Sequence, residues 1–130
     1  MTQNLFLIFN HSFTMEQEAD ARALLGVSRI IDLPAELKEL WGDIPPDLPA
    51  LGEYLSPFRA WLLSKTRPGD YVLIQGDFGA SFLLVSFALA RELVPIYSTT
   101  RRVAAEEKQD DGSIRVVHNF EHRLFRKYGF

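Results

Sequence analysis

The fold of this chain is decided by one stretch of its sequence, Tyr71-Val72-Leu73-Ile74-Gln75-Gly76-Asp77-Phe78-Gly79-Ala80-Ser81. A short apolar run predicts a buried strand, a turn with glycine follows, and a helical pattern continues over residues 80–93. Such a junction is typical of α/β sheets, whose ligands bind outside the carboxyl ends of the strands. Backbone N–H groups and the helix dipole favour anions there. The spacing Gly76-x-x-Gly79 matches no dinucleotide or nucleoside triphosphate pattern, so it identifies neither kind of site.

Strands alternate with helices along the first 100 residues. Thr14 and Gln17 form a capping box for a helix that Gly26 stops, and Pro57 either splits another helix or marks its true start. The predicted order is strand 5–9, helix 14–25, strand 29–33, helix 35–41, helix 51–66, strand 71–75, helix 80–93 and strand 95–98. This order predicts right-handed crossovers and a Rossmann-like, mainly parallel sheet with flanking helices.

The last quarter of the chain has a different pattern. Two strand-like runs, 102–108 and 114–120, flank an Asp-Gly turn at Asp111-Gly112, which predicts a C-terminal β-hairpin. No repeat or linker interrupts the chain, so residues 1–130 are expected to form a single domain. The side chains expected in the core include Trp41, Trp61, Phe82, Leu83, Val85, Phe87 and Leu89.

Composition excludes several classes of protein. No apolar run approaches the roughly 20 residues that span a bilayer, the amino terminus lacks the basic start of a signal peptide, and there is no cysteine. We therefore expect a cytoplasmic protein with no membrane partner. The net charge of −3 argues against binding to long nucleic acid. Residues 101–130 nevertheless hold seven Lys and Arg against five Asp and Glu, whereas residues 1–100 hold seven against twelve.

Three polar segments follow predicted strands and should meet at one edge of a parallel sheet. They are Asn10-His11-Ser12, Gln75-Gly76-Asp77 and Ser98-Thr99-Thr100-Arg101. Each also has a structural interpretation. Asp77 would serve equally well as a helix cap. The hydroxyls of residues 98–100 would serve as partners of backbone groups, and His11 as a helix-cap neighbour with an ordinary pKa. His118 and His122 lack the acidic neighbours of a metal site, so no metal or cofactor is expected.

Several segments together resemble a small CRISPR-associated family, the Csx family numbered twenty, which is found beside type III systems. The most specific are Gln75-Gly76-Asp77-Phe78-Gly79-Ala80 and Thr99-Thr100-Arg101; the others are Asn10-His11-Ser12-Phe13-Thr14, Leu40-Trp41 with Ile44-Pro45-Pro46, Gly69-Asp70-Tyr71-Val72-Leu73-Ile74, Tyr97-Ser98, and Phe125-Arg126-Lys127-Tyr128-Gly129. The resemblance implies a CARF-like Rossmann fold. It also implies a ring nuclease that cleaves cyclic oligoadenylate, chiefly cyclic tetra-adenylate, and thereby switches off antiviral signalling.

The residues agree with that chemistry. A ribose 2′-OH held in line with the neighbouring phosphorus cleaves the phosphodiester without metal and leaves a 2′,3′-cyclic phosphate. We expect Arg101 to contact the scissile phosphate, and Asp77 or His11 to orient or deprotonate the 2′-OH; His11 is also a candidate acid for the leaving oxygen. The other expected ligand-binding residues are Asn10, Ser12, Gln75, Gly76, Phe78, Gly79, Ser98, Thr99, Thr100 and Arg102.

Since the ring is roughly two-fold symmetric, a homodimer is expected. The alternative is a non-catalytic protein that binds the ring as a sponge or sensor.

Overall fold

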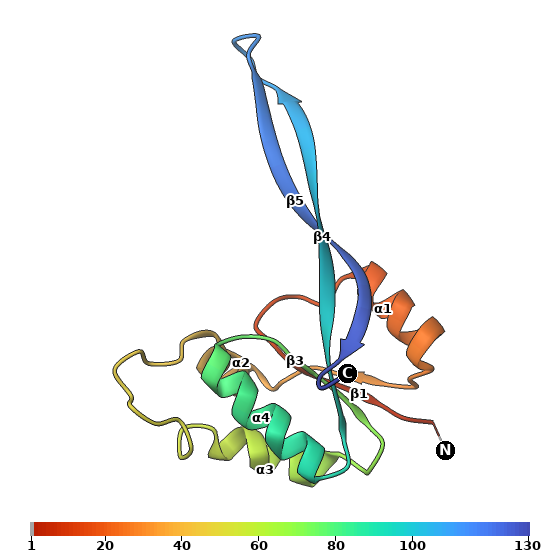
Figure 1. Cartoon of the computed structure of the whole chain (residues 1–130), viewed down its shortest axis with the longest axis vertical. Helices are drawn as coiled ribbons and strands as arrows, with labels where there is room; N and C mark the ends of the chain where they lie inside the picture. The colour runs from red at the N-terminus through yellow and green to blue at the C-terminus, as the bar shows by residue number, and fades with distance from the viewer. Residues whose placement is uncertain (1) are drawn as a thin grey trace.

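The computed structural model describes residues 2–130, which form a five-stranded sheet with helices on both faces (Figure 1). The strands lie in the order β2-β1-β3-β4-β5. The first four are parallel and β5 is antiparallel to β4, which confirms the mainly parallel α/β sheet with a C-terminal hairpin. The strands are β1 (Leu5–Ile8), β2 (Ile30–Ile31), β3 (Tyr71–Ile74), β4 (Val94–Lys108) and β5 (Ile114–Lys127).

The helices begin and end largely where the sequence indicates. They are α1 (Met15–Asp20), the π-helix η1 (Ala21–Leu25), α2 (Ala35–Gly42), α3 (Ser56–Lys65) and α4 (Phe78–Ala90). The capping box of Thr14 and Gln17 starts α1, and Gly26 ends η1 with a φ of 68°. Pro57 lies in the first turn of α3, so it marks the start of that helix and does not split it. None of the helices within residues 2–130 is both long and apolar enough to cross a membrane.

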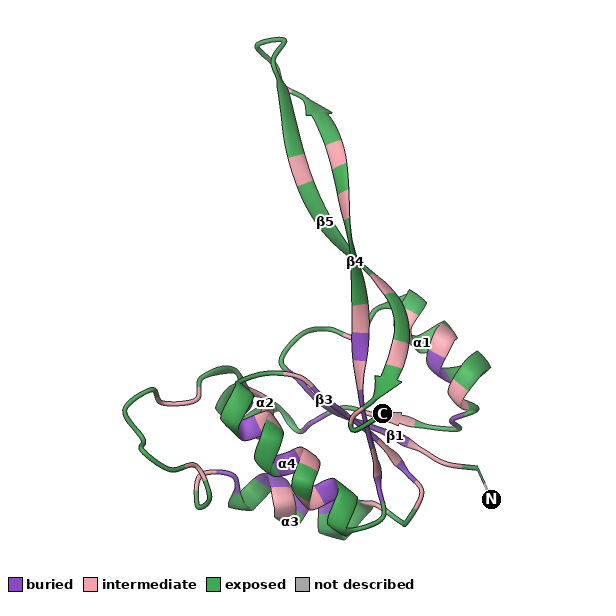
Figure 2. Cartoon of the chain, viewed as in Figure 1, coloured by how far each residue is buried: buried purple, intermediate pink, exposed green. Residues whose placement is uncertain are grey.

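Successive residues of the central strands point to opposite faces of the sheet and supply two separate apolar clusters. Phe6 and Ile8 of β1 pack with α2, α3 and α4 on one face. Leu5 and Leu7 pack with Ala21 of η1 on the other face. Both faces of β1 are therefore covered, as its continuous apolar run predicts, and burial is concentrated in the middle of the sheet (Figure 2). Trp41 and Trp61 are buried as expected.

Helix α4 corrects part of the predicted core. It buries a narrow line of side chains, Ala80, Leu84 and Ala88. The predicted core residues Phe82, Leu83 and Leu89 are exposed, whereas Val85 and Phe87 are half-buried. Because α4 is apolar on every side, the sequence gives no indication of which face meets the sheet. The two small alanines let the helix approach the strands closely and leave Phe78 and Phe82 in solvent.

Strand β4 corrects the predicted boundary after Ser98. The sequence predicts a short strand and then a separate hairpin strand, but β4 runs unbroken from Val94 to Lys108. Its pairing with β5 shifts register between Ser98 and Thr100, a bulge that bends the ribbon and increases its twist. Beyond this point residues 100–121 form a two-stranded ribbon that projects far from the rest of the molecule (Figure 1). We call residues 100–121 the arm, and residues 2–99 and 122–130 the body.

Candidate functional site

Gln75 connects four elements at the carboxyl end of β3. Its backbone N–H donates to the carbonyl of Ile8 (3.1 Å), and its own carbonyl accepts from the Trp41 indole (2.8 Å). Its side-chain oxygen accepts from the Ser98 N–H at 2.7 Å. The ends of β1 and β3 and the middle of β4 are thereby fixed to one another, beside α2. The side-chain amide NH2 group of Gln75 makes no hydrogen bond to any residue within 2–130, so it is available to a ligand.

Gly76 is required by packing. A Cβ atom there would lie 2.7–2.9 Å from three atoms of the Trp41 ring, closer than real contacts allow. At Gly79 a Cβ would meet nothing nearer than 3.5 Å. The close approach that glycine permits is therefore taken by Trp41 at Gly76, whereas the backbone at Gly79 remains open.

Asp77 caps α4, as its structural interpretation predicts. Its Oδ2 accepts from the N–H of Ala80 at 3.0 Å. The N–H groups of Phe78 and Gly79 have no acceptor within the described residues 2–130. Two backbone donors at the positive end of a helix of 13 residues are thus available to an anion.

A cavity of about 590 Å³ opens beside this helix end, between α4, β4 and the end of the chain. Gln75, Gly76 and Phe78 of the predicted set line it. The remaining lining residues are Ser81, Phe82, Val85, Tyr97, Lys127, Tyr128, Gly129 and Phe130. The Ser81 hydroxyl is buried and has no hydrogen-bond partner within residues 2–130. Five aromatic rings, one ammonium group and an unpaired hydroxyl suit a ligand with flat bases and phosphates.

The cavity wall contains a perturbed tyrosine. Burial, and to a smaller extent the nearby Tyr97, raise the pKa of Tyr128 above its ordinary value. The Tyr128 hydroxyl donates to the carbonyl of Ile74, and its ring centroid lies 4.8 Å from that of Tyr97. Arg126 lies over the Tyr97 ring and donates to its hydroxyl at 2.9 Å. These contacts fix both tyrosine rings in the wall of the cavity.

A second polar cluster lies at the base of the arm. His122 Nδ1 lies 2.5 Å from the Ser98 hydroxyl, and His122 Nε2 lies 2.8 Å from Asp20 Oδ2. The His122 ring therefore bridges Asp20 of α1 and Ser98 of β4. Gln17 donates to the same hydroxyl at 3.3 Å. His122 was considered only as a metal ligand, and nothing in the sequence predicts its contact with Asp20, because the two residues are 102 apart and share no motif. Within residues 2–130 no three His, Asp or Glu side chains are grouped to hold a metal ion.

The segment after β1 is not drawn into the cavity. Asn10 and His11 are exposed; Asn10 lies against Gly42, and the His11 ring packs edge-on to Phe9. Ser12 lines a different hollow, between α1 and β2. The three predicted segments therefore follow neighbouring strands, but their side chains are distributed over more than one hollow.

The segment 98–102 is also divided. The Thr99 hydroxyl bonds the backbone of Leu124 in both directions at 3.2 Å, as its structural interpretation predicts. Thr100 lines a hollow of about 510 Å³ with His122 and the amino end of α1. Arg101 and Arg102 do not follow a strand end, because β4 continues past them. They are exposed on the arm, opposite Glu121 and Phe120.

The fold and the cavity define a small α/β protein with an aromatic-walled hollow at the carboxyl edge of its parallel strands. The chain belongs to the Uncharacterized protein MJ1673 family, whose profile matches residues 3–126. It is 48% identical over 124 residues to Uncharacterized protein MJ1673 of Methanocaldococcus jannaschii, and the alignment covers 95% of each chain. No solved structure matches the chain.

Proposed function

We propose that this protein is a ring nuclease of the cyclic oligoadenylate class, with cyclic tetra-adenylate as its chief substrate. The observation that carries the proposal is the cavity of about 590 Å³ beside the amino end of α4. Its rings offer stacking surfaces for adenine, which contribute about 1–3 kcal/mol per base in single-strand binding proteins. The free N–H groups of Phe78 and Gly79 and the ammonium of Lys127 suit the phosphates. The resemblance to the Csx family numbered twenty supports the same ligand and a CARF-like form of the Rossmann fold.

The cleavage we propose is metal-independent. The ribose 2′-OH attacks the adjacent phosphorus, the bond to the 5′-oxygen of the next nucleotide breaks, and a 2′,3′-cyclic phosphate remains. In this proposal Arg101 stabilises charge on the phosphate oxygens and the leaving oxygen takes a proton from His11. Asp77 and His11 remain the two candidates for the group that accepts the 2′-OH proton.

The assembly we propose is a cytoplasmic homodimer. The ligand is roughly two-fold symmetric, whereas one chain offers a single edge of this kind. A two-fold axis would bring two such edges to one ring. Light scattering that finds a monomer with and without ligand would count against it.

One observation favours the alternative, a protein that binds the ring without cleaving it. His11, Asp77 and Arg101 do not line the cavity, and the Asp77 carboxylate is already engaged in capping α4. A sponge or sensor needs the aromatic walls and the free N–H groups but no acid or base. The cavity alone therefore fits binding at least as well as catalysis.

Incubation of the purified protein with cyclic tetra-adenylate in EDTA, followed by chromatography, tests the proposal. Linear products with cyclic phosphate ends are expected of the nuclease, and tight binding of an intact ring is expected of the sponge. Absence of both would refute both.

Single-turnover rates test the proposed roles. Arg101→Ala should lower the rate by about two to three orders of magnitude, and His11→Ala by about one to two. Arg115→Ala is the matched control, because Arg115 is an exposed arginine nearer the tip of the arm. A wild-type rate for Arg101→Ala would show that its assignment is wrong, and attention would move to Arg123, Arg126 and Lys127.

A further inference from the structure

The two faces of the arm differ in how far their apolar side chains are exposed to solvent. Residues paired across the ribbon share a face, and one face carries Val103, Ala105 and Val117, all half-buried. Residues of opposite charge are neighbours in the strand register at both ends of this face, Arg101 beside Glu121 and Glu107 beside Arg115, but no ion pair joins them. We call it the closed face.

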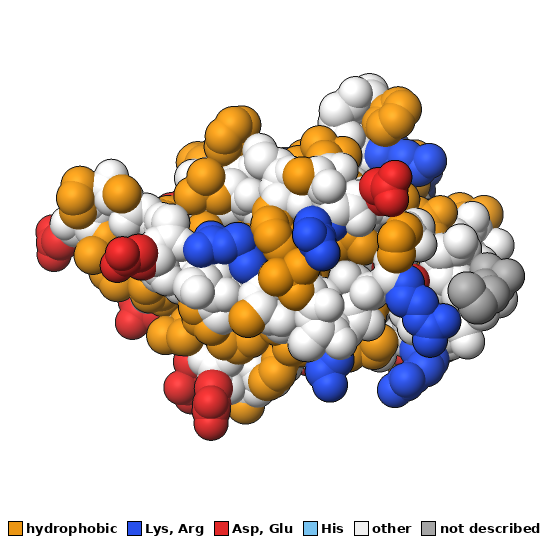
Figure 3. Space-filling model, turned by 90° about the horizontal axis from the view of Figure 1, so that it is seen from below, with side chains coloured by type: hydrophobic (Ala, Val, Ile, Leu, Met, Phe, Trp, Pro, Cys, Tyr) orange, Lys and Arg blue, Asp and Glu red, His pale blue; other side chains and the backbone are white. Residues whose placement is uncertain are grey.

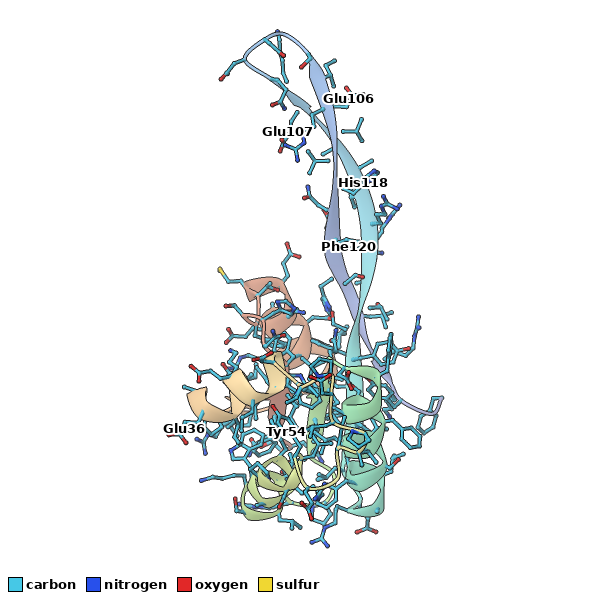
Figure 4. The ribbon with its side chains drawn as sticks, turned by 90° about the vertical axis from the view of Figure 1, so that its left-hand side faces the viewer. Glu36, Tyr54, Glu106, Glu107, His118 and Phe120 are labelled. Atoms are coloured by element: carbon cyan, nitrogen blue, oxygen red, sulfur yellow. The ribbon has the colours of Figure 1, made fainter. Side chains whose placement is uncertain are left out.

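The other face, which we call the open face, carries the large apolar side chains of the arm that are mostly exposed. Phe120 is 71% exposed, Ile114 63% and Val116 57%. Figure 4 shows Glu106 and Glu107 directed to opposite sides of the ribbon, as this alternation requires. No ion pair within residues 2–130 involves a charged side chain of the arm on either face, so the two faces differ in their apolar side chains and not in their charges. The open face therefore carries exposed apolar surface along its length.

An isolated two-stranded ribbon is at best marginally stable in water and needs a further strand or a helix against one face. The helices of this chain cannot supply that cover for the outer arm, because they lie around the body while the arm projects away from it (Figure 1). No residue between 100 and 121 is buried. The missing layer must come from outside the chain.

The body also has an exposed apolar surface, which lies on helix α4. Phe78, Phe82 and Leu89, at helical spacing on α4, are 94%, 70% and 51% exposed. The stripe from Phe78 to Leu89 is about 17 Å long at 1.5 Å per residue. The open face from Phe120 to Ile114 is about 20 Å long at 3.3 Å per residue. Two uncovered apolar surfaces of matching length are thus present on every copy of the chain.

The charge distribution indicates in which direction the arm would lie along α4 and which class of partner it suits. Residues 106–111, at the tip of the arm, hold Glu106, Glu107, Asp110 and Asp111 against a single lysine. Exposed cations, Arg91 and Lys65, follow the carboxyl end of α4 and end α3. Lys and Arg side chains lie among apolar ones on the side of the molecule opposite the arm (Figure 3). The arm as a whole has four Lys and Arg and five Asp and Glu, so it does not suit nucleic acid.

We propose that the open face of the arm packs along α4 of a second copy of this chain, with the arm base at Phe78 and the acidic tip near Arg91. The arm of the second copy packs in the same way along α4 of the first, which gives a closed two-fold interface. Each arm then lies over Phe78 and Phe82 of the other copy and closes its cavity. This last consequence rests on the proposed function, whereas the interface itself does not.

Multi-angle light scattering of the full chain tests the interface without any ligand. A dimer is expected. Phe120→Glu on the arm and Phe82→Glu on α4 should each weaken it by about 30-fold or more, as loss of a central aromatic contact does. Asn119→Glu is the matched control, since Asn119 neighbours Phe120 on the closed face, and it should leave the dimer intact. Circular dichroism verifies folding, which exposed positions should not disturb. A monomeric wild type, or a dimer indifferent to both phenylalanine changes, would overturn the proposal.

Disulfide formation gives a second test, because the chain has no cysteine of its own. Val116→Cys chains are mixed with Ser86→Cys chains, Ser86 being exposed between Phe82 and Leu89 on α4. The mixture should form a disulfide between unlike chains faster than either variant forms one alone. Self-linkage of Val116→Cys without mixed linkage would show that arms pack on arms, which contradicts the proposal. A wild-type dimer without a cross-link that neither binds nor cleaves cyclic tetra-adenylate would refute the proposed function and leave the interface standing.

Discussion

The body and the arm are built from the same sheet but differ in what stabilises them. Strands β1 and β3 are covered on both faces, and their side chains belong to two buried clusters. The same β4 that contributes Ile96 to one of these clusters continues into an arm with no buried residue. Regular strand pairing therefore does not by itself imply a core. Where a ribbon extends without cover, its apolar side chains mark a surface that belongs to an assembly.

The largest difference between the two regions should appear in stability. Phe58→Ala removes a fully buried ring of the body and should lower the free energy of unfolding by about 3–5 kcal/mol. Val116→Ala on the open face of the arm should change it by less than about 0.5 kcal/mol in dilute protein. Urea denaturation at low protein concentration measures both. Equal costs at that concentration would show that the arm is covered within its own chain. A cost of Val116→Ala that grows with protein concentration would instead support the second copy.

Within the body, two glycines of the site should respond differently to alanine. Gly76→Ala places a methyl group 2.7–2.9 Å from the Trp41 ring, so it should destabilise the protein by about 1–3 kcal/mol. Gly79→Ala is the matched control. Its Cβ meets nothing closer than 3.5 Å, and alanine favours a helix interior by up to about 1 kcal/mol. Thermal unfolding of the two variants is compared, and only Gly76→Ala should lower the midpoint, because only its methyl group contacts Trp41. A stable Gly76→Ala variant would mean that Trp41 moves freely.

Substitutions of Asp77, which caps α4, distinguish a structural role of this residue from a catalytic one. Asp77→Ala should cost about 0.5–2 kcal/mol because α4 loses its cap, whereas Asp77→Asn should cost little, since asparagine caps nearly as well. Unfolding curves and cleavage rates of both variants are compared. If Asp77→Asn keeps stability and loses turnover, the carboxylate takes part in the reaction. If it keeps both, Asp77 is a cap only and His11 remains the candidate base.

Local patterns predicted the body well because each depends on neighbours in the sequence. The capping box of Thr14, the stop at Gly26 and the start of α3 at Pro57 are fixed by backbone chemistry within one turn. The parallel pairing of β1 and β3 follows from two apolar runs that both need cover. The mainly parallel sheet could therefore be derived without any structure.

The site was less predictable because it depends on contacts between distant residues. Nothing local indicates that Trp41 occupies the space beside Gly76, or that Asp20 and His122 meet. The orientation of α4 was also not predictable, since a helix that is apolar on every side has no preferred face. The continuation of β4 past Ser98 was missed because the turn-like residues Ser98-Thr99-Thr100 form a bulge in a continuing strand.

The smallest predicted effect is an alkaline one, and it belongs to the body alone because the arm has no tyrosine. Burial raises the pKa of Tyr128 above 10.0 in the folded protein. Below about pH 10 the phenol is neutral in both states, and its contribution to stability is fully present. As the pH rises further the unfolded chain loses its proton first, so stability falls until the pH passes the pKa of the folded protein. Tyr128→Phe removes this dependence and also the hydrogen bond to Ile74, which costs about 1 kcal/mol at neutral pH. Urea midpoints between about pH 8 and 11 should therefore fall less steeply in the variant. The pKa of Tyr54 is also raised, so the urea midpoint of both proteins should still fall somewhat with pH. If the midpoints of the two proteins fall in parallel, Tyr128 ionises as freely in the folded protein as in the unfolded chain.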